Sequence, residues 1–335
     1  MSSSSRETVL SVNKPKLLIT ADFNAELADR LREHFDVITP PPVDTGESLA
    51  MGPHRDLLSD VTVIVCELDK VDAQTLAAAP HLKLVVSCRS MPVNVDLEAC
   101  AERGITVATT PARNADVTAE VTFGLILATI RDFFAAARYM SAKSWTDDDV
   151  FEPYREFRGP SMVGRTVGVV GAGAIGRRVA ARARAFESHV LFYDPFVTQE
   201  SLGDLGELVS LETLFATADI ITLHAPLIPQ TQGMVTRAHL ESMKKGVYFV
   251  NVGRAGLVDE DALRDVIQSG LVERAGFDVY WHEPLPLDHW LFEADNVLLL
   301  PHIAGASDDV ITSHSRIALD AIATWRASQS ATVAL

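Results

Sequence analysis

The sequence predicts an α/β protein with two doubly wound parallel sheets, one in each of two domains. The chain has 335 residues, more than the roughly 250 to 300 at which single hydrophobic cores stop growing. Short β-branched runs alternate with helix-like segments in two successive series, which is the rhythm of βαβ units. A polar and aromatic stretch with Pro and Gly at 142–162 separates the two series and predicts a surface loop.

The first series begins near the N-terminus. Its expected strands are Lys16–Thr20, Val61–Cys66, Leu82–Ser87 and Ile105–Ala108. The apolar pattern of 24–35 predicts a helix between the first two strands. Residues 1–13 lack the apolar core of a signal peptide. We therefore expect a loose tail there and a cytoplasmic protein.

A long apolar-periodic stretch, 117–139, predicts one helix that connects the domains and leaves an apolar face for a second copy of the chain. The second series of strands follows. Its expected members are Thr166–Val170, His189–Tyr193, Asp219–Leu223, Val247–Val250, Arg274–Phe277 and Val297–Leu300. A last helix over about 308–327 closes the fold.

Charge and cysteine usage exclude several classes of function. A formal net charge of -16 disfavours nucleic acid and anionic membranes as partners. Cys66, Cys88 and Cys100 form no CxxC pair, so neither a disulfide framework nor a metal site is expected. Cys88 lies beside Arg89, which is one reason to consider a nucleophile, but a small buried hydrophobic residue is the better interpretation.

The strand at 166–170 runs directly into a glycine-rich motif, Gly171-Ala-Gly173-Ala-Ile-Gly176, and 177–185 continues as a helix. In this context the three glycines permit a tight turn, the approach of a pyrophosphate and close helix–strand packing. Asp194 ends the next strand, eighteen residues after Gly176, where it would bind ribose hydroxyls. No Arg or Lys follows at 195–198 to accept a 2′-phosphate. The motif therefore predicts NAD in preference to NADP, although turn glycines and a solvated Asp remain an alternative.

Several ordered motifs extend this pattern over nearly the whole chain. They are Asn94–Asp96, Glu102–Ile105, Thr110–Ala115, Val169–Gly176, Leu223–Leu227 with Thr231, Asn251–Arg254 with Val258–Asp259, Gly276–Val279 with Glu283–Pro284, and Pro301–Gly305. In this series they resemble the D-isomer-specific 2-hydroxyacid dehydrogenases, a family that includes phosphoglycerate dehydrogenases and glyoxylate/hydroxypyruvate reductases. The resemblance implies a Rossmann cofactor domain, 111–305, inserted into a flavodoxin-like substrate domain made of 1–110 and 306–335.

The resemblance also implies an NAD-dependent oxidoreductase that interconverts a small D-2-hydroxy acid and its 2-keto acid. It assigns catalysis to Arg254, Glu283 and His302. His302 would be the acid–base group, and Glu283 would orient its ring and favour the charged form. The planar fork of Arg254 suits a substrate carboxylate. The alternatives are a hydrogen-bonded loop histidine at 302, and an ordinary pre-proline acid at 283 with His282 beside it.

The resemblance also implies which residues contact the cofactor, from the position of each motif in the sequence. The implied set is Gly171, Gly173, Ala174, Ile175, Gly176, Asp194, His224, Ala225, Pro226, Val252, Gly253, Arg254, Asp278, His302, Ala304 and Gly305. For His224, a packed core histidine is an equally good interpretation.

The substrate loop departs from the family pattern. Arg89 and Met91 replace glycines whose N–H groups hold the carboxylate, and Pro92 has no N–H. The expected substrate-binding residues are Arg89, Ser90, Met91, Arg113 and Arg254. In one interpretation Arg89 and Arg113 bind a second anionic or hydroxylated end, such as a phosphate or a sugar acid. In the other, both form structural ion pairs.

Two further functions stay open beside the leading one. The first alternative, within the same family of dehydrogenases, is a D-3-phosphoglycerate or sugar-acid dehydrogenase. The second, in another class, is an NAD-sensing protein related to corepressors. Family geometry also implies a homodimer through the 117–139 region.

Overall fold

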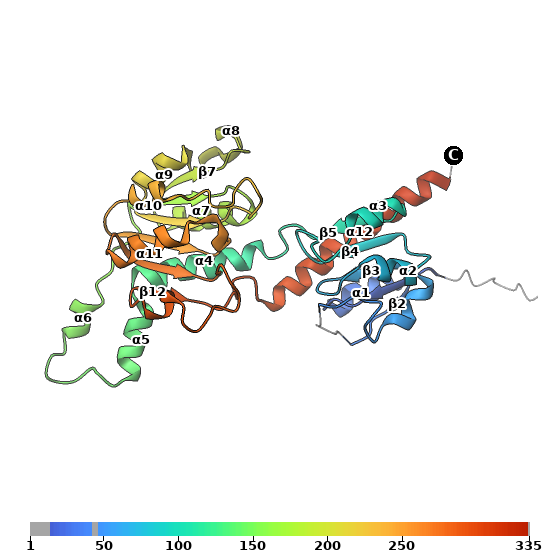
Figure 1. Cartoon of the computed structure of the whole chain (residues 1–335), viewed down its shortest axis with the longest axis horizontal. Coiled ribbons are helices and arrows are strands. Elements are labelled where there is room, and N and C mark those ends of the chain that lie inside the picture. The colour runs from blue at the N-terminus through green and yellow to red at the C-terminus, as the bar shows by residue number, and fades with distance from the viewer. Residues whose placement is uncertain (1–13, 42–45, 334–335) are drawn as a thin grey trace, which may run out of the picture. The chain divides into compact units, whose positions relative to one another are not determined.

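The computed structural model describes residues 14–41 and 46–333 of the chain. The chain divides into two compact units, Met1–Arg113 with Ser307–Leu335 and Asn114–Ala306, here called the first and second units (Figure 1). The tail expected at 1–13 lies outside the described residues. The domain boundaries expected from the sequence were 110/111 and 305/306.

The first unit contains a five-stranded parallel sheet in the order β2-β1-β3-β4-β5. Its strands are β1 (Lys16–Ile19), β2 (Asp36–Ile38), β3 (Val61–Cys66), β4 (Leu84–Ser87) and β5 (Thr106–Thr109). This is a flavodoxin-like order, with the reversal of direction between β1 and β3. The two faces of the sheet are both covered, so β3 and β4 are buried apolar runs.

Helices pack on both faces of this sheet. They are α1 (Ala25–Leu31), η1 (Arg55–Asp60), α2 (Ala73–Ala78), α3 (Leu97–Glu102) and α12 (Asp308–Val333). One core joins α1 and α12 to the sheet, and another joins η1, α2 and α3. Asn24, Asp72 and Asp96 cap α1, α2 and α3 by accepting a backbone N–H of the first turn.

The second unit contains a seven-stranded parallel sheet in the order β12-β11-β10-β9-β6-β7-β8. Its strands are β6 (Thr166–Val170), β7 (His189–Tyr193), β8 (Glu207–Leu208), β9 (Ile220–Leu223), β10 (Val247–Asn251), β11 (Val272–Phe277) and β12 (Val297–Leu299). The chain reverses its direction of travel through the sheet between β6 and β9, as in dinucleotide-binding folds. Ligands of such sheets bind outside the carboxyl ends of the strands at this reversal.

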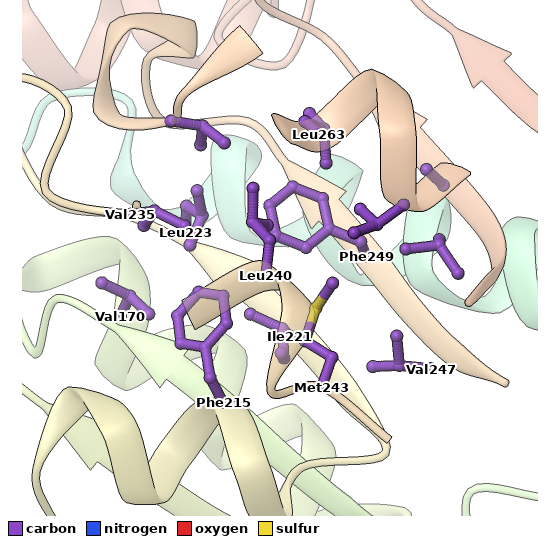
Figure 2. Packing of buried hydrophobic residues seen from close by; sticks show 14 of the residues in the cluster. Val170, Phe215, Ile221, Leu223, Val235, Leu240, Met243, Val247, Phe249 and Leu263 are labelled. Carbon is purple, nitrogen blue, oxygen red and sulfur yellow. The ribbon is translucent and has the colours of Figure 1, made fainter. Parts of the chain in front are cut away.

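Two hydrophobic cores cover the faces of this sheet. The helices and 3-10 turns of the unit are α4 (Ala115–Ile130), α5 (Phe133–Ser141), α6 (Glu152–Glu156), α7 (Ala174–Ala185), α8 (Gln199–Leu202), η2 (Gly203–Leu205), α9 (Leu211–Thr217), α10 (Arg237–Glu241), η3 (Ala255–Leu257), α11 (Glu260–Gln268) and η4 (Trp290–Glu293). Figure 2 shows the core beneath α9, α10 and α11, where Phe215 and Phe249 lie among Leu240, Met243 and Leu263. Truncating a buried Phe in such a core costs ~3–5 kcal/mol.

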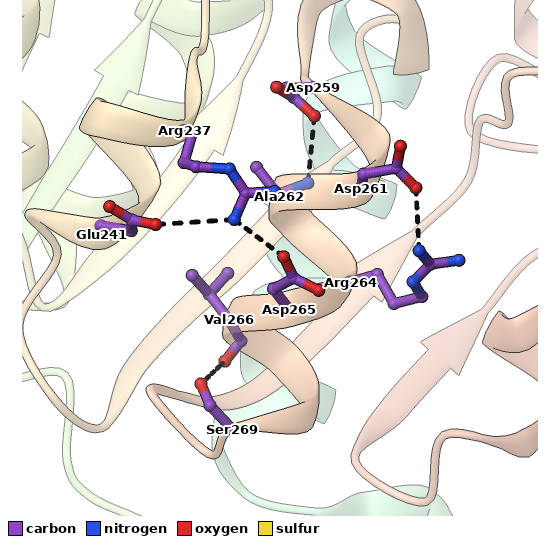
Figure 3. A network of polar contacts seen from close by, with 9 residues as sticks. All are labelled: Arg237, Glu241, Asp259, Asp261, Ala262, Arg264, Asp265, Val266 and Ser269. Atoms are coloured by element: carbon purple, nitrogen blue, oxygen red, sulfur yellow. Dashed lines mark hydrogen bonds and ion pairs between the residues drawn. The ribbon is translucent and has the colours of Figure 1, made fainter.

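Polar contacts join α10 and α11 at the surface (Figure 3). Arg237 Nη1 lies 2.7 Å from Asp265 Oδ2 and 3.5 Å from Glu241 Oε1. Asp259 caps α11 by accepting from Ala262 N at 3.0 Å. The ion pairs are solvent-exposed, so the buried apolar faces contribute most of the packing energy of these helices.

The prediction of a single helix over 117–139 was wrong. Two helices stand there, α4 and α5, because Asp132 adopts a left-handed backbone conformation with φ of 52°. Its carboxylate accepts from Arg274 on β11 at 2.7 Å. Gly159 packs against the end of α4, where a Cβ would lie 1.9 Å from Ile130 O. Tertiary contacts therefore end α4 within an otherwise helical pattern.

The three cysteines are buried and free. Burial, with the charge of Glu67, raises the pKa of Cys88 to about 12, so this thiol is unreactive at neutral pH. None of the helices in 14–41 and 46–333 is long and apolar enough to cross a membrane.

Candidate active site

The glycine-rich loop after β6, residues 171–176, forms an open anion-binding loop that we call the cradle. Gly171 has φ of 100°, and a Cβ there would lie 2.7 Å from Ala225 N. A Cβ at Gly176 would lie 2.0 Å from Gly171 O, whereas one at Gly173 would meet nothing within 4 Å. The outer glycines thus permit close packing, and the middle one faces free space.

The N-terminus of α7 faces this cradle. Gly173 is its N-cap and makes no side-chain capping bond. The N–H groups of Ala174, Ile175 and Gly176 in the first turn therefore stay available, with the positive end of the helix dipole, for an anion. The cradle lies at the reversal between β6 and β9. These features fit the pyrophosphate of a dinucleotide.

Asp194 follows β7 at the edge of the cradle. Its Oδ2 accepts from Ala172 N at 2.8 Å, and its Oδ1 accepts from Phe196 N at 2.9 Å. Each oxygen keeps a lone pair for a ribose hydroxyl. Arg177 is the neighbouring cation, and its guanidinium already donates to the carbonyls of Ala172 and Ser201.

His224 follows β9, and its backbone packs against Gly171. Its Nε2 lies 3.0 Å from Thr222 Oγ1, and its Nδ1 is buried without a partner among the described residues. Burial lowers the pKa of His224 to about 3, so the ring stays neutral. Ala225 beside it is buried and Pro226 is exposed. The ring thus packs beneath the cradle, and the backbone forms its wall.

The loop after β10 directs Arg254. Asn251 Oδ1 accepts from Gly253 N at 3.0 Å, and its Nδ2 donates to Arg254 O at 3.1 Å. A Cβ at Gly253 would lie 2.8 Å from Leu223 O, so this loop also packs closely on β9. Val252 is buried. Arg254 Nη1 donates to Gly253 O at 2.6 Å, and within the described ranges the guanidinium forms no ion pair, so its other N–H groups can bind a ligand anion.

His302 and Glu283 form a hydrogen-bonded pair, with 2.7 Å between His302 Nδ1 and Glu283 Oε2. The side chains are 46% and 37% exposed, so the pair faces solvent. Since Nδ1 donates to the carboxylate, Nε2 is left to exchange a proton with a ligand. His282 is not part of the pair, because its ring bonds Pro284 O at 3.0 Å.

Glu283 is held in its ionised form. Burial alone would raise its pKa, but the hydrogen bonds from His302 and Tyr280 N outweigh that effect. The charges of His302 and Arg254 act in the same direction, and the pKa of Glu283 lies below its ordinary value. The ionised carboxylate fixes the orientation of the imidazole ring through Nδ1.

The backbone around His302 is held by buried groups. His302 has φ of 55°, a left-handed conformation that costs a non-Gly residue about 1–3 kcal/mol. Asp278 is fully buried and accepts from Ile303 N at 2.8 Å and from Ala304 N at 2.7 Å. Tyr280 Oη donates to Leu300 O at 2.7 Å. These bonds fix the position of the imidazole.

The remaining residues of the expected set lie nearby in the second unit. Ala304 is buried, and a Cβ at Gly305 would lie 2.8 Å from Asn114 Nδ2. A cavity of about 460 Å³ adjoins the His302–Glu283 pair and is lined mainly by apolar side chains, including Leu285 and Leu300. Asn251 and Tyr280 have positioning roles that no local sequence pattern predicts, because both act through contacts between loops.

In the first unit, Arg89 and Arg113 differ in the contacts of their guanidinium groups. Arg113 Nη2 lies 2.5 Å from Glu67 Oε1, and its Nη1 lies 3.0 Å from His314 Nδ1. Arg89 has no ion pair or side-chain hydrogen bond with the part of the chain that the structure describes, and its Nε is buried. Ser90 and Met91 are exposed beside it. Of the two interpretations of Arg113, its contacts support the structural one.

No group of three or more His, Cys, Asp or Glu side chains within 14–41 and 46–333 is arranged to hold a metal ion.

Comparison with known proteins agrees with this geometry. Residues 123–304 match a family model described as D-isomer specific 2-hydroxyacid dehydrogenase, NAD binding domain. The glyoxylate reductase of Thermococcus kodakarensis is 34% identical over 296 residues, which is 88% of each chain. The D-3-phosphoglycerate dehydrogenase of Mycobacterium tuberculosis is 42% identical over 294 residues, 88% of this chain. The chain spans only about half of that relative, 53% of its length.

A solved structure shows the same fold. The D-lactate dehydrogenase of Aquifex aeolicus, complexed with NAD and lactic acid, aligns with a TM-score of 0.70 at 26% identity. The alignment covers 93% of this chain and 96% of that one.

Proposed function

Because this chain belongs to the D-isomer-specific 2-hydroxyacid dehydrogenase family, we propose that it interconverts a small D-2-hydroxy acid and its 2-keto acid with His302 as the acid–base group. It is an oxidoreductase that acts on CH–OH donors. The observation that carries the proposal is the 2.7 Å bond between His302 and an ionised Glu283. This pair leaves His302 Nε2 free at a solvent-facing position.

In the direction of reduction, the substrate is a 2-keto acid. When bound, the nicotinamide cofactor supplies a hydride to the carbonyl carbon. The carbonyl π electrons move to the oxygen, and His302 gives that oxygen the proton from Nε2. The N–H bond breaks as the O–H bond forms, and the ring becomes neutral. General acid catalysis of this kind contributes about 10²–10⁴-fold in rate.

Glu283 and Arg254 support this proton transfer. The carboxylate of Glu283 stabilises the imidazolium before the transfer and fixes the ring through Nδ1. Arg254, whose Nη1 is fixed by Gly253 O, would bind the substrate carboxylate with its remaining N–H groups. It also stabilises the negative charge that develops on the carbonyl oxygen.

We assign the cofactor site to the cradle and propose that NAD is preferred to NADP. The cradle glycines and the first turn of α7 would hold the pyrophosphate, and Asp194 would accept from the ribose hydroxyls. A 2′-phosphate would instead face the fixed carboxylate of Asp194. Arg177 offers little compensation, because backbone carbonyls already engage its guanidinium.

A homodimer through α5 and α6 completes the proposal. None of the residues of α5 is buried, although Phe133, Phe134 and Met140 are large and apolar. Phe151 and Tyr154 in the following segment are 69% and 74% exposed. Contiguous apolar surface of this kind is typical of an interface. A single-subunit mass in solution at micromolar concentration would contradict the dimer.

The function is tested by following NADH oxidation with a panel of 2-keto acids, from glyoxylate and pyruvate to hydroxypyruvate and longer acids. We expect turnover with at least one acid, and tighter binding of NADH than of NADPH by fluorescence. Arg254→Gln should raise KM and lower kcat, whereas Arg264→Gln on the surface of α11 should change neither. NADH binding without turnover of any acid would indicate the NAD-sensing alternative.

A further inference from the structure

Glu260, the first residue of α11, accepts two hydrogen bonds from the loop at 280–290. Its Oε1 accepts from His289 Nε2 at 2.9 Å and from Trp290 Nε1 at 3.2 Å. Hydrogen bonds to an ionised acceptor are stronger than those between neutral groups. The same loop carries Glu283. A carboxylate on α11 therefore holds the end of the loop from which Glu283 bonds the imidazole.

His289 uses both ring nitrogens within the second unit. Its Nδ1 accepts from Leu291 N at 3.3 Å, so Nε2 carries the proton that it donates to Glu260. The side chain is 15% exposed. The ring therefore joins the loop to α11 and has no nitrogen left for a ligand.

The start of the loop is anchored beside its end. Trp281 Nε1 donates to Val258 O at 3.2 Å. The indole of Trp281 also stacks on the ring of His289, with 6.5 Å between the ring centroids and an angle of 17° between the planes. Both ends of the loop therefore meet at residues 258–260, and Glu283 lies between them.

The segment that anchors the loop also carries Arg254. This residue precedes η3, and Glu260 follows it after a short connection. The connection is fixed from outside, because Val235 N donates to Leu257 O at 2.9 Å and Asp259 N donates to Val235 O at 3.0 Å. One rigid segment thus has Arg254 at its start and Glu260 at its end.

From these contacts we infer that Glu260 is a positioning residue for the reaction and acts through the loop of Glu283. The inference rests on the proposed function, in which Glu283 orients His302 through a 2.7 Å hydrogen bond. Such a pair is productive only when surrounding hydrogen bonds hold it within a narrow range of geometry. Glu260 supplies two of those bonds from the neighbouring helix.

Three single variants test this role in NADH-dependent reduction of the best 2-keto acid. Glu260→Ala removes both bonds at the end of the loop and should lower kcat about 10-fold. Glu260→Gln keeps an acceptor oxygen and should recover part of that loss. Asp261→Ala is the matched control and should leave kcat unchanged, because it removes an acid of the same helix turn that bonds Arg264 instead (Figure 3).

The pH profile separates positioning from a general loss of structure. Hydrogen bonds from His302 and Tyr280 N keep the pKa of Glu283 below its ordinary value. A loosened loop weakens these bonds, so the pKa of Glu283 should rise toward the ordinary value. The decline of kcat at low pH should therefore begin at a higher pH in Glu260→Ala than in the wild type.

A double variant tests whether Glu260 acts through Glu283. In the Glu283→Gln background the partner of His302 is already changed, so adding Glu260→Ala should lower kcat by less than about twofold further. A purely structural role would multiply the two losses. Thermal unfolding of each variant verifies that it is folded, and Glu260→Gln replaces Glu260→Ala in both backgrounds if the alanine variant does not fold.

An equal loss in both backgrounds would overturn the inference, and so would a wild-type kcat and pH profile in Glu260→Ala. Neither result would affect the proposed function, since both include turnover. Absence of turnover with every acid by the wild type would instead reject the proposed function, and the inference with it.

Discussion

The carboxyl ends of the two sheets differ in how their polar groups are satisfied. In the second unit, Gly173 faces free space and the His302–Glu283 pair is exposed to solvent. In the first unit, Glu67, Arg113 and His314 satisfy one another. The second unit is the one that matches the NAD binding domain of the family, and it is where we propose the proton chemistry.

The difference has a physical origin in the residues that end each strand. Glycines after β6 add no side chain, and so they leave backbone N–H groups available to an anion. Glu67 after β3 and Arg113 ahead of α4 form an ion pair within the first unit. We therefore expect neither side chain to bind a ligand. Substitutions at the two kinds of position should therefore change different properties, binding in one unit and stability in the other.

The largest effect is expected for Gly173→Asp. Asp is a favourable N-cap, and nothing lies within 4 Å of a Cβ there, so the melting temperature should stay equal or rise. The new carboxylate would lie where we place the pyrophosphate, and NADH affinity should fall at least ~100-fold. Fluorescence titration measures the affinity. Gly173→Ser is the matched uncharged control and should lose much less.

A smaller effect is expected for Glu283→Gln, with a loss in kcat of reduction of about 10–100-fold. Reduction by the wild type should decline at low pH as Glu283 becomes protonated, and this decline should be absent from the variant. The pKa of Glu283 is below its ordinary value. The wild type therefore retains the carboxylate at neutral pH and loses it only as the pH falls through that lowered value. A pH profile identical to that of the wild type would rule out this role.

In the first unit, Arg113→Gln should act on stability instead. It leaves Glu67 and His314 without their partner at side chains that are largely buried. We expect a loss of about 2 kcal/mol, or roughly 30-fold in the unfolding constant. Urea denaturation measures this loss, and the double variant with Glu67→Gln should recover part of it. Unchanged stability with altered substrate preference would contradict a structural Arg113.

The smallest effect is expected for Arg237→Gln on the surface of the second unit (Figure 3). Its ion pairs with Asp265 and Glu241 are solvent-exposed, and such pairs contribute little. Calorimetry should detect no change in melting temperature, and kinetics should match the wild type. A clear loss of stability would show that these contacts matter more than their exposure implies.

Much of the fold follows from local sequence patterns. The β-branched runs predicted most strands. The segment from β6 through Gly171–Gly176 was predicted in full, because its strand, turn and helix are adjacent in the sequence. The strands β2 and β8 escaped detection, since three and two residues carry no periodicity. The family assignment also followed from motif order, and the comparisons confirm it.

The parts that the sequence did not predict depend on residues far apart in the chain. The break between α4 and α5 depends on Asp132 bonding Arg274. The same limit applies to the arginines of the first unit. Arg113 is paired because Glu67 after β3 and His314 on the last helix both reach its guanidinium. Local patterns show neither contact, and so Arg89 and Arg113 looked alike.

The central claim is that His302 is the acid–base group of an NAD-dependent dehydrogenase. Its most direct test is kcat/KM for reduction of the best 2-keto acid by His302→Ala, measured together with NADH affinity. We predict a loss of about 10³-fold with a much smaller change in NADH affinity, below about tenfold, because the contacts that we propose for the pyrophosphate and the ribose are made by other residues. A loss smaller than about tenfold, with the variant folded, would contradict the account.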